Sequence, residues 1–273
     1  MKAKKTNEKK VGIGTLCVQG GYVPACGEPR QVPIYQTTTF KYDTTKHMGD
    51  LFDLKASGYF YTRLANPTND LVAKKIAALE GGVAAILTSS GQAASTFAVL
   101  NLAGAGDHVV SSAQIYGGTF NLFAVSLKKL GVEFTFVDPD ADEKTIQAAF
   151  RPNTKCVFGE TVANPSGAVL DIAKFARVAH RNGVPLIVDN TFPTPILCRP
   201  FRFGCDIVTT RRRSTWTATP PRSAAASSTR ATSTGRSTPT RSPASSSPIR
   251  RTTAFPIRRR SASSPTSPSA RRT

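Results

Sequence analysis

The sequence predicts an α/β fold in which a mostly parallel sheet is covered by helices on both faces. Strand-like apolar runs alternate with helical patterns from residue 66 to residue 209, which is the rhythm of parallel strands joined by crossover helices. The clearest run, residues 186–188, follows a helical pattern and the turn at Gly183. Such a short apolar run indicates a strand buried on both faces. It ends in Asp189, at the carboxyl edge where open parallel sheets bind ligands.

Each expected element rests on a local signal. Thr68 or Asn69 can cap a helix that stops before the glycine pair at 81–82, and Asp142 can cap another. The expected strands cover residues 84–87, 108–111, 133–137, 155–158 and 186–188, and one more starts at residue 207. One expected helix ends at residue 79, and the others cover residues 93–102, 118–130, 143–150 and 172–181. Residues 11–65 are rich in Gly, Pro and Thr and show little periodicity, so we expect an extended arm that wraps a neighbouring subunit.

The charge of the chain is concentrated at one end. The 273 residues carry a formal net charge of +19. Residues 211–273 contain 14 Arg and no Lys, Asp or Glu. No apolar run approaches the length of a membrane span, and the lysine-rich start lacks the apolar core of a secretory signal. Five scattered cysteines and three single histidines, without a CxxC pair or a Cys/His cluster, favour reduced thiols, no metal site and a cytoplasmic protein.

The turns that follow the strands carry the chemistry. Ser89-Ser90-Gly91-Gln92 opens a helix whose free N–H groups suit a phosphate. Tyr116 precedes two glycines after the next strand, and Asn164 precedes a proline after a later one. Each turn alone is more often structural than functional, and Asp189 alone could be an acid paired with an Arg. Together they place a phosphate cradle, an aromatic plate, an amide and a carboxylate at one edge of one sheet.

That combination is what pyridoxal 5'-phosphate (PLP) needs: a carboxylate for the ring nitrogen, a stacking partner, and N–H donors with an Arg for the phosphate. From about residue 12 to residue 209 the sequence closely resembles the Cys/Met-metabolism family of PLP enzymes, within the fold-type I group. The matching stretches are Tyr61-Thr-Arg63-Leu-Ala-Asn66-Pro67-Thr68, Leu79-Glu-Gly-Gly82, Ser89-Ser-Gly-Gln92, Tyr116-Gly-Gly-Thr119, Glu160-Thr-Val-Ala-Asn-Pro165 and Val188-Asp-Asn-Thr191.

The resemblance implies a set of site residues. Asp189 would bind the pyridinium nitrogen, Tyr116 would stack on the ring and assist the γ-leaving group as the catalytic residue, and Asn164 would contact the ring hydroxyl. The amides of Gly91 and Gln92 would hold the phosphate, while Tyr61 and Arg63 would reach the phosphate of a neighbouring subunit. The full set of implied cofactor-binding residues is Tyr61, Arg63, Ser90, Gly91, Gln92, Tyr116, Asn164, Asp189 and Thr191.

Within the family, residues 27–31 and 51–59 look most like the O-acetylhomoserine sulfhydrylase branch. This implies a γ-replacement that converts O-acetylhomoserine and sulfide, or a thiol, to homocysteine and acetate, in a homodimer or tetramer. Methionine γ-lyase and cystathionine γ-synthase activities stay open as alternatives.

The resemblance breaks after Thr209. The family strand reads Val-Thr-His-Ser-Thr-Thr-Lys-Tyr-Met-Asp-Gly-His-Ala, but here Ser214 stands at the position of the Schiff-base lysine, and no lysine follows Lys174. If one base is missing near Thr210, the codons of residues 213–220 can be reread as Lys-Tyr-Met-Asp-Gly-His-Ala. The same rule can turn residues 224–235 into Gly-Gly-Gly-Val-Ile-Asp-Ser-Gly-Asn-Phe-Asp-Trp and residues 251–254 into Ser-Tyr-His-Gly. We therefore hypothesise a frameshift that leaves residues 210–273 out of frame and the chain inactive.

Three regions follow from this interpretation. Residues 1–65 form the arm, residues 66–209 form a truncated PLP-binding large domain, and residues 210–273 form a tail rich in Arg, Ser, Thr and Pro that is expected to be disordered. Taken as a genuine sequence, the tail would make the chain a noncatalytic basic protein that binds nucleic acid nonspecifically through phosphates. The arginines have a simpler origin in GC-rich DNA read in the wrong frame.

Overall fold

The computed structural model describes residues 11–211 and the backbone of residues 225–229. All of these lie in one compact unit, Met1–Arg241. The described helices and turns are α1 (Ile13–Gln19), α2 (Thr45–Phe52), α3 (Pro67–Glu80), α4 (Gly91–Leu100), α5 (Gly117–Asn121), the π-helical turn η1 (Leu122–Leu127), α6 (Glu143–Ala148), α7 (Ile172–Arg181), α8 (Thr194–Leu197) and the 3-10 turn η2 (Pro200–Phe203). The strands are β1 (Ala84–Thr88), β2 (His108–Ser112), β3 (Glu133–Val137), β4 (Thr154–Glu160), β5 (Leu186–Asp189), β6 (Ile207–Arg211) and β7 (Ala225–Thr229).

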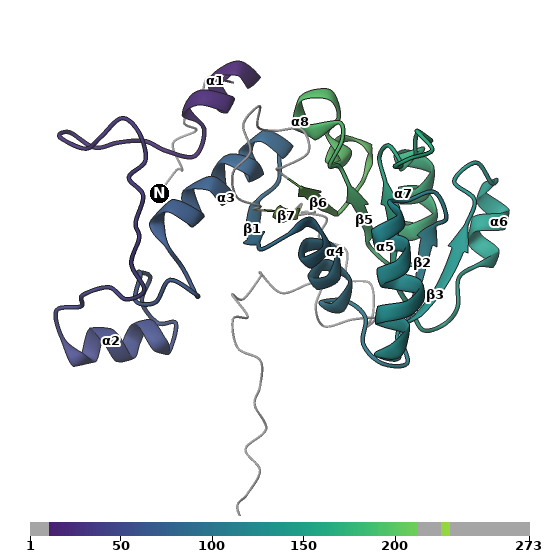
Figure 1. Ribbon diagram of the computed structural model, residues 1–273, viewed down its shortest axis with the longest axis horizontal. Helices are drawn as coiled ribbons and strands as arrows, with labels where there is room; N and C mark the ends of the chain where they lie inside the picture. Colours follow the sequence, from purple (N-terminus) through teal and green to yellow (C-terminus); the bar gives the residue numbers. More distant parts are fainter. Residues whose placement is uncertain (1–10, 212–224, 230–273) are drawn as a thin grey trace, which may run out of the picture. The chain divides into compact units, whose positions relative to one another are not determined.

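The strands form one sheet in the order β1-β7-β6-β5-β4-β2-β3 (Figure 1). Strands β2 to β6 pair in parallel, whereas β7 is antiparallel to both of its neighbours. The expected α/β class with a mostly parallel sheet is therefore confirmed. Because the parallel strands all end at the same edge, the turns after β2, β4 and β5 meet there.

Helices cover the sheet on both sides, and alternate residues of each strand serve the two cores. Val188 of β5 belongs to the core beneath α7, together with Phe175 and Val178. Ile187, one residue earlier, belongs to the core beneath α4 and η1. Asp189 is on the same side as Ile187, which directs its carboxylate toward α4 and α5.

Helix boundaries agree with the local signals in most places. Asp171 caps α7 and Asp142 caps α6, each by accepting a hydrogen bond from a backbone N–H three residues on. Helix α3 begins earlier than expected, because Asn66 rather than Thr68 or Asn69 is the cap. The helix expected over residues 118–130 is α5 continued by η1 and by two further helical residues, 128 and 129.

The structure departs from the sequence expectation in two regions. The arm was expected to be extended, but it contains α1 and α2, and α2 is capped by Thr44, whose hydroxyl accepts from the N–H of His47. The arm also packs on the start of α3, where Thr68 Oγ1 donates to the carbonyl of Pro33 at 2.8 Å.

The second departure lies in the tail, for which no fold was expected after residue 209. Strand β6 continues to Arg211, and residues 225–229 form β7 between β1 and β6. The edges of β1 and β6 offer backbone hydrogen bonds to any segment that can lie extended between them. The sequence of β7, Ala-Ala-Ser-Ser-Thr, suits this place because it contains neither proline nor a charged residue. The residues of β7 lie within residues 224–235, which the other reading frame can turn into a family-like segment. The remainder of the tail, including Ser214, lies outside the described residues.

Candidate active site at the carboxyl edge of the sheet

Asp189 ends β5 at the centre of the sheet, where its backbone is in register with Glu160 of β4 and Thr209 of β6. Thr191 holds one of its carboxylate oxygens twice, because the N–H of Thr191 donates to Asp189 Oδ1 at 3.0 Å and the hydroxyl donates to the same atom at 2.5 Å. No described residue donates a hydrogen bond to Oδ2. The turn after β5 therefore fixes the carboxylate and leaves one oxygen for a ligand.

Burial dominates the electrostatics of this acid. It raises the pKa of Asp189 to about 6, against the lowering effect of the two hydrogen bonds from Thr191. A carboxylate in this situation gains much from a cationic partner, since the partner offsets the loss of hydration. A protonated pyridine nitrogen is such a partner.

Glu160 is in register with Asp189 on the neighbouring strand and was not among the expected site residues. Burial raises its pKa to about 8, and the neighbouring Asp189 carboxylate adds to the shift. Its Oε2 accepts a hydrogen bond from the backbone N–H of Tyr116. Glu160 therefore holds the turn after β2 against the tip of β4. An acid directly after a buried strand is the same signal that identified Asp189, so the sequence could have revealed it.

Tyr116 is 41% exposed and precedes α5. A methyl group at Gly118 would lie 2.5 Å from Tyr116 Cε1 and 3.0 Å from Gln92 Nε2, so the ring packs closely over this glycine. Gln92 Nε2 also donates to Thr119 Oγ1 at 3.3 Å. The starts of α4 and α5 are thus joined, and the aromatic ring lies beside the beginning of α4.

Ser90 caps α4, because its Oγ accepts a hydrogen bond from the N–H of Ala93 at 3.1 Å. A helix cannot use its first N–H groups internally, and no described residue accepts from the N–H of Gly91 or Gln92. These two donors and the positive end of the helix dipole are free to receive an anion, and their role as a phosphate cradle stays a prediction. The side chain of Ser90 serves the helix cap in this structure.

The other expected residues are not joined to this group. Asn164 lies in the loop after β4 and makes no hydrogen bond to another expected site residue in the described part of the chain. Arg63 donates to the hydroxyl of Tyr61 at 3.0 Å and lies over its ring, but both residues belong to the segment before α3. Their predicted place at the phosphate of a neighbouring subunit stays a prediction.

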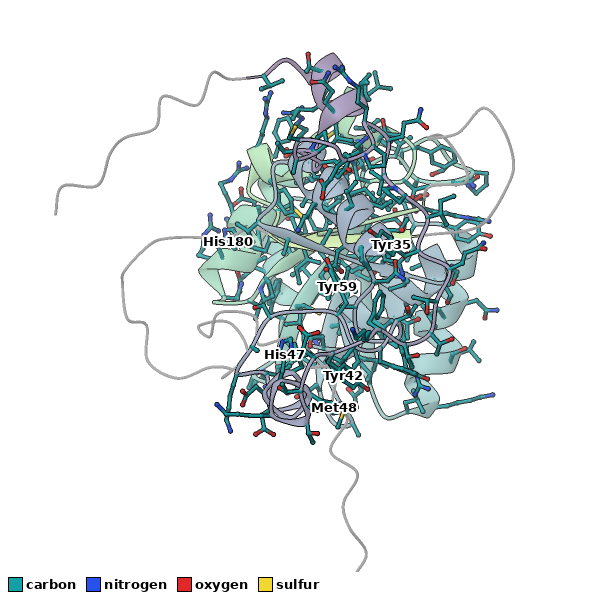
Figure 2. The ribbon with its side chains drawn as sticks, turned by 90° about the vertical axis from the view of Figure 1, so that its left-hand side faces the viewer. Tyr35, Tyr42, His47, Met48, Tyr59 and His180 are labelled. Atoms are coloured by element: carbon teal, nitrogen blue, oxygen red, sulfur yellow. The ribbon has the colours of Figure 1, made fainter. Side chains whose placement is uncertain are left out.

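The three histidines do not cluster with one another: His47 is in α2, His108 in β2 and His180 in α7. Figure 2 shows His47 and His180 well apart. Within the described ranges, no cluster of His, Cys, Asp and Glu side chains could hold a metal ion. In the same part of the chain, no helix is both long and apolar enough to cross a membrane. A cavity of about 850 Å³ between α1 and the α8–η2 segment has lining residues such as Leu16, Leu197 and Phe203, none of which belongs to the candidate site.

A buried carboxylate tip, a free pair of helix N–H groups and an exposed aromatic ring are the elements of a PLP site, and the residues present fit that cofactor. The family model of Cys/Met metabolism PLP-dependent enzymes matches residues 14–212. The chain belongs to this family, whose cofactor is PLP and whose members carry out γ-replacement and γ-elimination reactions.

The relatives lie within this chemistry. The chain is 49% identical over 208 residues to the O-acetyl-L-homoserine sulfhydrylase of Corynebacterium glutamicum, covering 76% of this chain and 48% of that protein. It is 43% identical over 202 residues to the L-methionine gamma-lyase of Fusobacterium nucleatum, covering 73% of this chain and 51% of that protein. The chain thus spans about half the length of the curated relatives it matches.

A solved structure of a putative O-acetylhomoserine (thiol)-lyase from Campylobacter jejuni superposes with a TM-score of 0.75 at 34% identity, covering 81% of this chain and 54% of that one. That structure contains N'-pyridoxyl-lysine-5'-monophosphate. The fold-type I architecture is therefore confirmed for the described part of this chain.

Proposed function

We propose that this chain is an O-acetylhomoserine sulfhydrylase by descent. The reaction would replace the γ-acetoxy group of O-acetylhomoserine with the sulfur of sulfide or a thiol, which gives homocysteine, or its thioether, and acetate. The higher identity to sulfhydrylases than to methionine γ-lyases supports this reaction over the lyase alternative. The observation that carries the PLP site is the Asp189 carboxylate, fixed on one oxygen by Thr191 and free on the other.

Each described residue would have a distinct role. PLP, when bound, supplies the electron sink that lets a substrate lose its α-proton and its γ-substituent. Asp189 would keep the ring nitrogen protonated, and Gly91 and Gln92 would donate their N–H groups to the phosphate. Tyr116 would stack on the ring, and its hydroxyl would serve as the acid for the departing acetate.

As written, the chain lacks the amine that would tether the cofactor. Ser214 stands at the expected lysine position, and no lysine follows Lys174. We propose that the chain binds PLP only dissociably and does not turn over substrate. The frameshift hypothesis explains the loss, because inserting one base near codon 210 restores Lys-Tyr-Met-Asp at residues 214–217.

The test compares two genes, the one that encodes this chain and one with a single base inserted near codon 210. Each protein is purified with PLP and assayed with three substrate sets: O-acetylhomoserine with sulfide, O-acetylhomoserine with cysteine, and methionine alone. We expect the restored protein to form homocysteine fastest from the first set, and the original chain to form none. Turnover by the original chain would contradict the inactivity, and a restored protein that acts only on methionine would contradict the sulfhydrylase assignment.

A further inference from the structure

Arg211 is the last residue of β6 and lies directly against the start of α4. Its backbone N–H donates to Thr191 Oγ1 at 3.0 Å, which ties the end of β6 to the turn that holds Asp189. A methyl group at Gly91 would lie 3.1 Å from Arg211 Cβ and 3.5 Å from both Cγ and Cδ. The aliphatic stem of Arg211 therefore runs across the first residue of the helix, where a side chain at residue 91 would crowd it.

This contact brings two positive groups together. The first N–H groups of α4 carry the positive end of the helix dipole, and the Arg211 guanidinium extends from a stem packed on them. No described Asp or Glu forms an ion pair with Arg211, although six other ion pairs occur in the described part of the chain. An arrangement of this kind is stable when an anion lies between the two positive groups.

A buried hydroxyl on the same strand face points to a polar ligand as well. Thr209 is two residues before Arg211, so both side chains project from the face of β6 that packs toward α4 with Ile207. Thr209 is 0% exposed, and its Oγ1 has no hydrogen-bond partner among the described residues. A buried hydroxyl normally finds a partner, and an oxygen of a ligand bound over α4 would supply one.

We propose that Arg211 completes the phosphate site from within the same chain. Its guanidinium would pair with the phosphate ester that the N–H groups of Gly91 and Gln92 hold, so the anion would not depend on an Arg from a neighbouring subunit. The family strand has serine at this position, so the cation is a property of this chain. The inference rests on the proposed PLP site, since it takes the start of α4 as the place of the phosphate.

The test uses the full chain with two probes, pyridoxamine 5'-phosphate and pyridoxamine. Neither has an aldehyde, so neither reacts with surface lysines, and they differ only in the phosphate. Arg211→Gln removes the charge and keeps most of the stem on Gly91, whereas Arg211→Lys keeps a charge without the bidentate fork. Arg202→Gln, at an exposed arginine of η2, is the matched control for net charge.

We expect Arg211→Gln to weaken pyridoxamine 5'-phosphate about 10- to 100-fold by isothermal titration calorimetry at low salt, because a charge-assisted hydrogen bond to phosphate is lost. Arg211→Lys should lie between wild type and Arg211→Gln, while Arg202→Gln and all affinities for pyridoxamine should stay unchanged. Titrations on the monomer fraction from gel filtration should give the same affinity as the unfractionated protein. Circular dichroism checks folding, and Arg211→Lys decides the outcome if Arg211→Gln does not fold.

Two outcomes separate this inference from the function on which it rests. If wild type binds pyridoxamine 5'-phosphate and Asp189→Asn weakens it while neither Arg211 variant does, the PLP site stands and the role of Arg211 is wrong. If wild type does not bind pyridoxamine 5'-phosphate at all, the proposed PLP site fails and the role of Arg211 fails with it.

Discussion

The tips of β4 and β5 lie side by side and both end in an acid, yet the two acids are held in different ways. Asp189 receives two hydrogen bonds from its own turn, both on Oδ1, and keeps Oδ2 open. Glu160 receives the N–H of Tyr116, which lies 44 residues away in the chain. Burial raises both pKa values, to about 6 for Asp189 and about 8 for Glu160.

Only one of these two acids is suited to serve a cofactor. Two buried carboxylates in register on adjacent strands do not both ionise readily, because each disfavours the charge of the other. The lower pKa of Asp189 makes it the one that is ionised at neutral pH and ready for a cation. Glu160, protonated under the same conditions, acts as a neutral acceptor that positions the turn carrying Tyr116.

The largest expected effect concerns Glu160 and stability. Its pKa is above the ordinary 4.5 in the folded state, so the folded state binds the proton more tightly than the unfolded chain does. The contribution of Glu160 to stability is therefore fully present below about pH 4.5 and is lost as pH rises toward 8. Glu160→Gln should reduce the loss of unfolding free energy between pH 5 and pH 8 by on the order of 3 kcal/mol, measured by urea denaturation.

Two controls define that result. Glu28→Gln, at an exposed glutamate of the arm, should leave the pH dependence as in wild type. Burial also raises the pKa of Asp189 to about 6 and that of Glu80 to about 7. Both acids change stability with pH in the same direction as Glu160, so part of the pH dependence of stability should persist in Glu160→Gln. An unchanged slope in Glu160→Gln would mean that Glu160 is ionised in the folded protein, and the contrast between the two tips would disappear.

The next effect concerns Asp189 and binding. Asp189→Asn keeps the shape of the side chain and its hydrogen bonds with Thr191, but it removes the negative charge that would face a pyridinium nitrogen. We expect pyridoxamine 5'-phosphate to bind about 10- to 100-fold more weakly, which corresponds to a lost charge-assisted hydrogen bond. Glu160→Gln is the matched control and should bind it within a few-fold of wild type. Equal losses in both variants would mean that the two tips do not differ in function.

A smaller effect is expected at Thr191. Thr191→Val removes the hydroxyl that donates to Asp189 Oδ1 and accepts from the N–H of Arg211, but it leaves the backbone hydrogen bond in place. We expect about a fivefold loss of pyridoxamine 5'-phosphate affinity, the value of one ordinary hydrogen bond. Affinity equal to wild type would show that the backbone N–H alone fixes the carboxylate.

The smallest effect separates two adjacent glycines. A methyl group at Gly118 would meet the ring of Tyr116, whereas one at Gly117 would have no atom within 4 Å. Gly118→Ala should displace the ring and weaken pyridoxamine 5'-phosphate about threefold, the contribution of one stacking contact. Gly117→Ala should bind as wild type does. If both variants bind alike, the present position of the Tyr116 ring is not the one used for stacking.

The sequence predicted the parts of this structure that local signals determine. The apolar run before Asp189 located β5, the cap at Asp142 located α6, and the small-residue turn located the start of α4. It did not predict Glu160 as the partner of Tyr116, because that contact joins two turns that only the sheet brings together. Strand β7 was not predicted for a related reason. Its pairing depends on the edges of β1 and β6, which only the folded sheet brings to either side of it.

A PLP site at the tip of β5 and the start of α4 that lacks its tethering lysine can be recognised chemically. The original chain and the frame-restored protein are each saturated with PLP, reduced with borohydride, denatured and analysed by peptide mass spectrometry. We expect one pyridoxyl group per chain on a single lysine of the restored protein. In the original chain, we expect no lysine to carry a pyridoxyl group in every molecule. A full label on one lysine of the original chain would contradict this expectation.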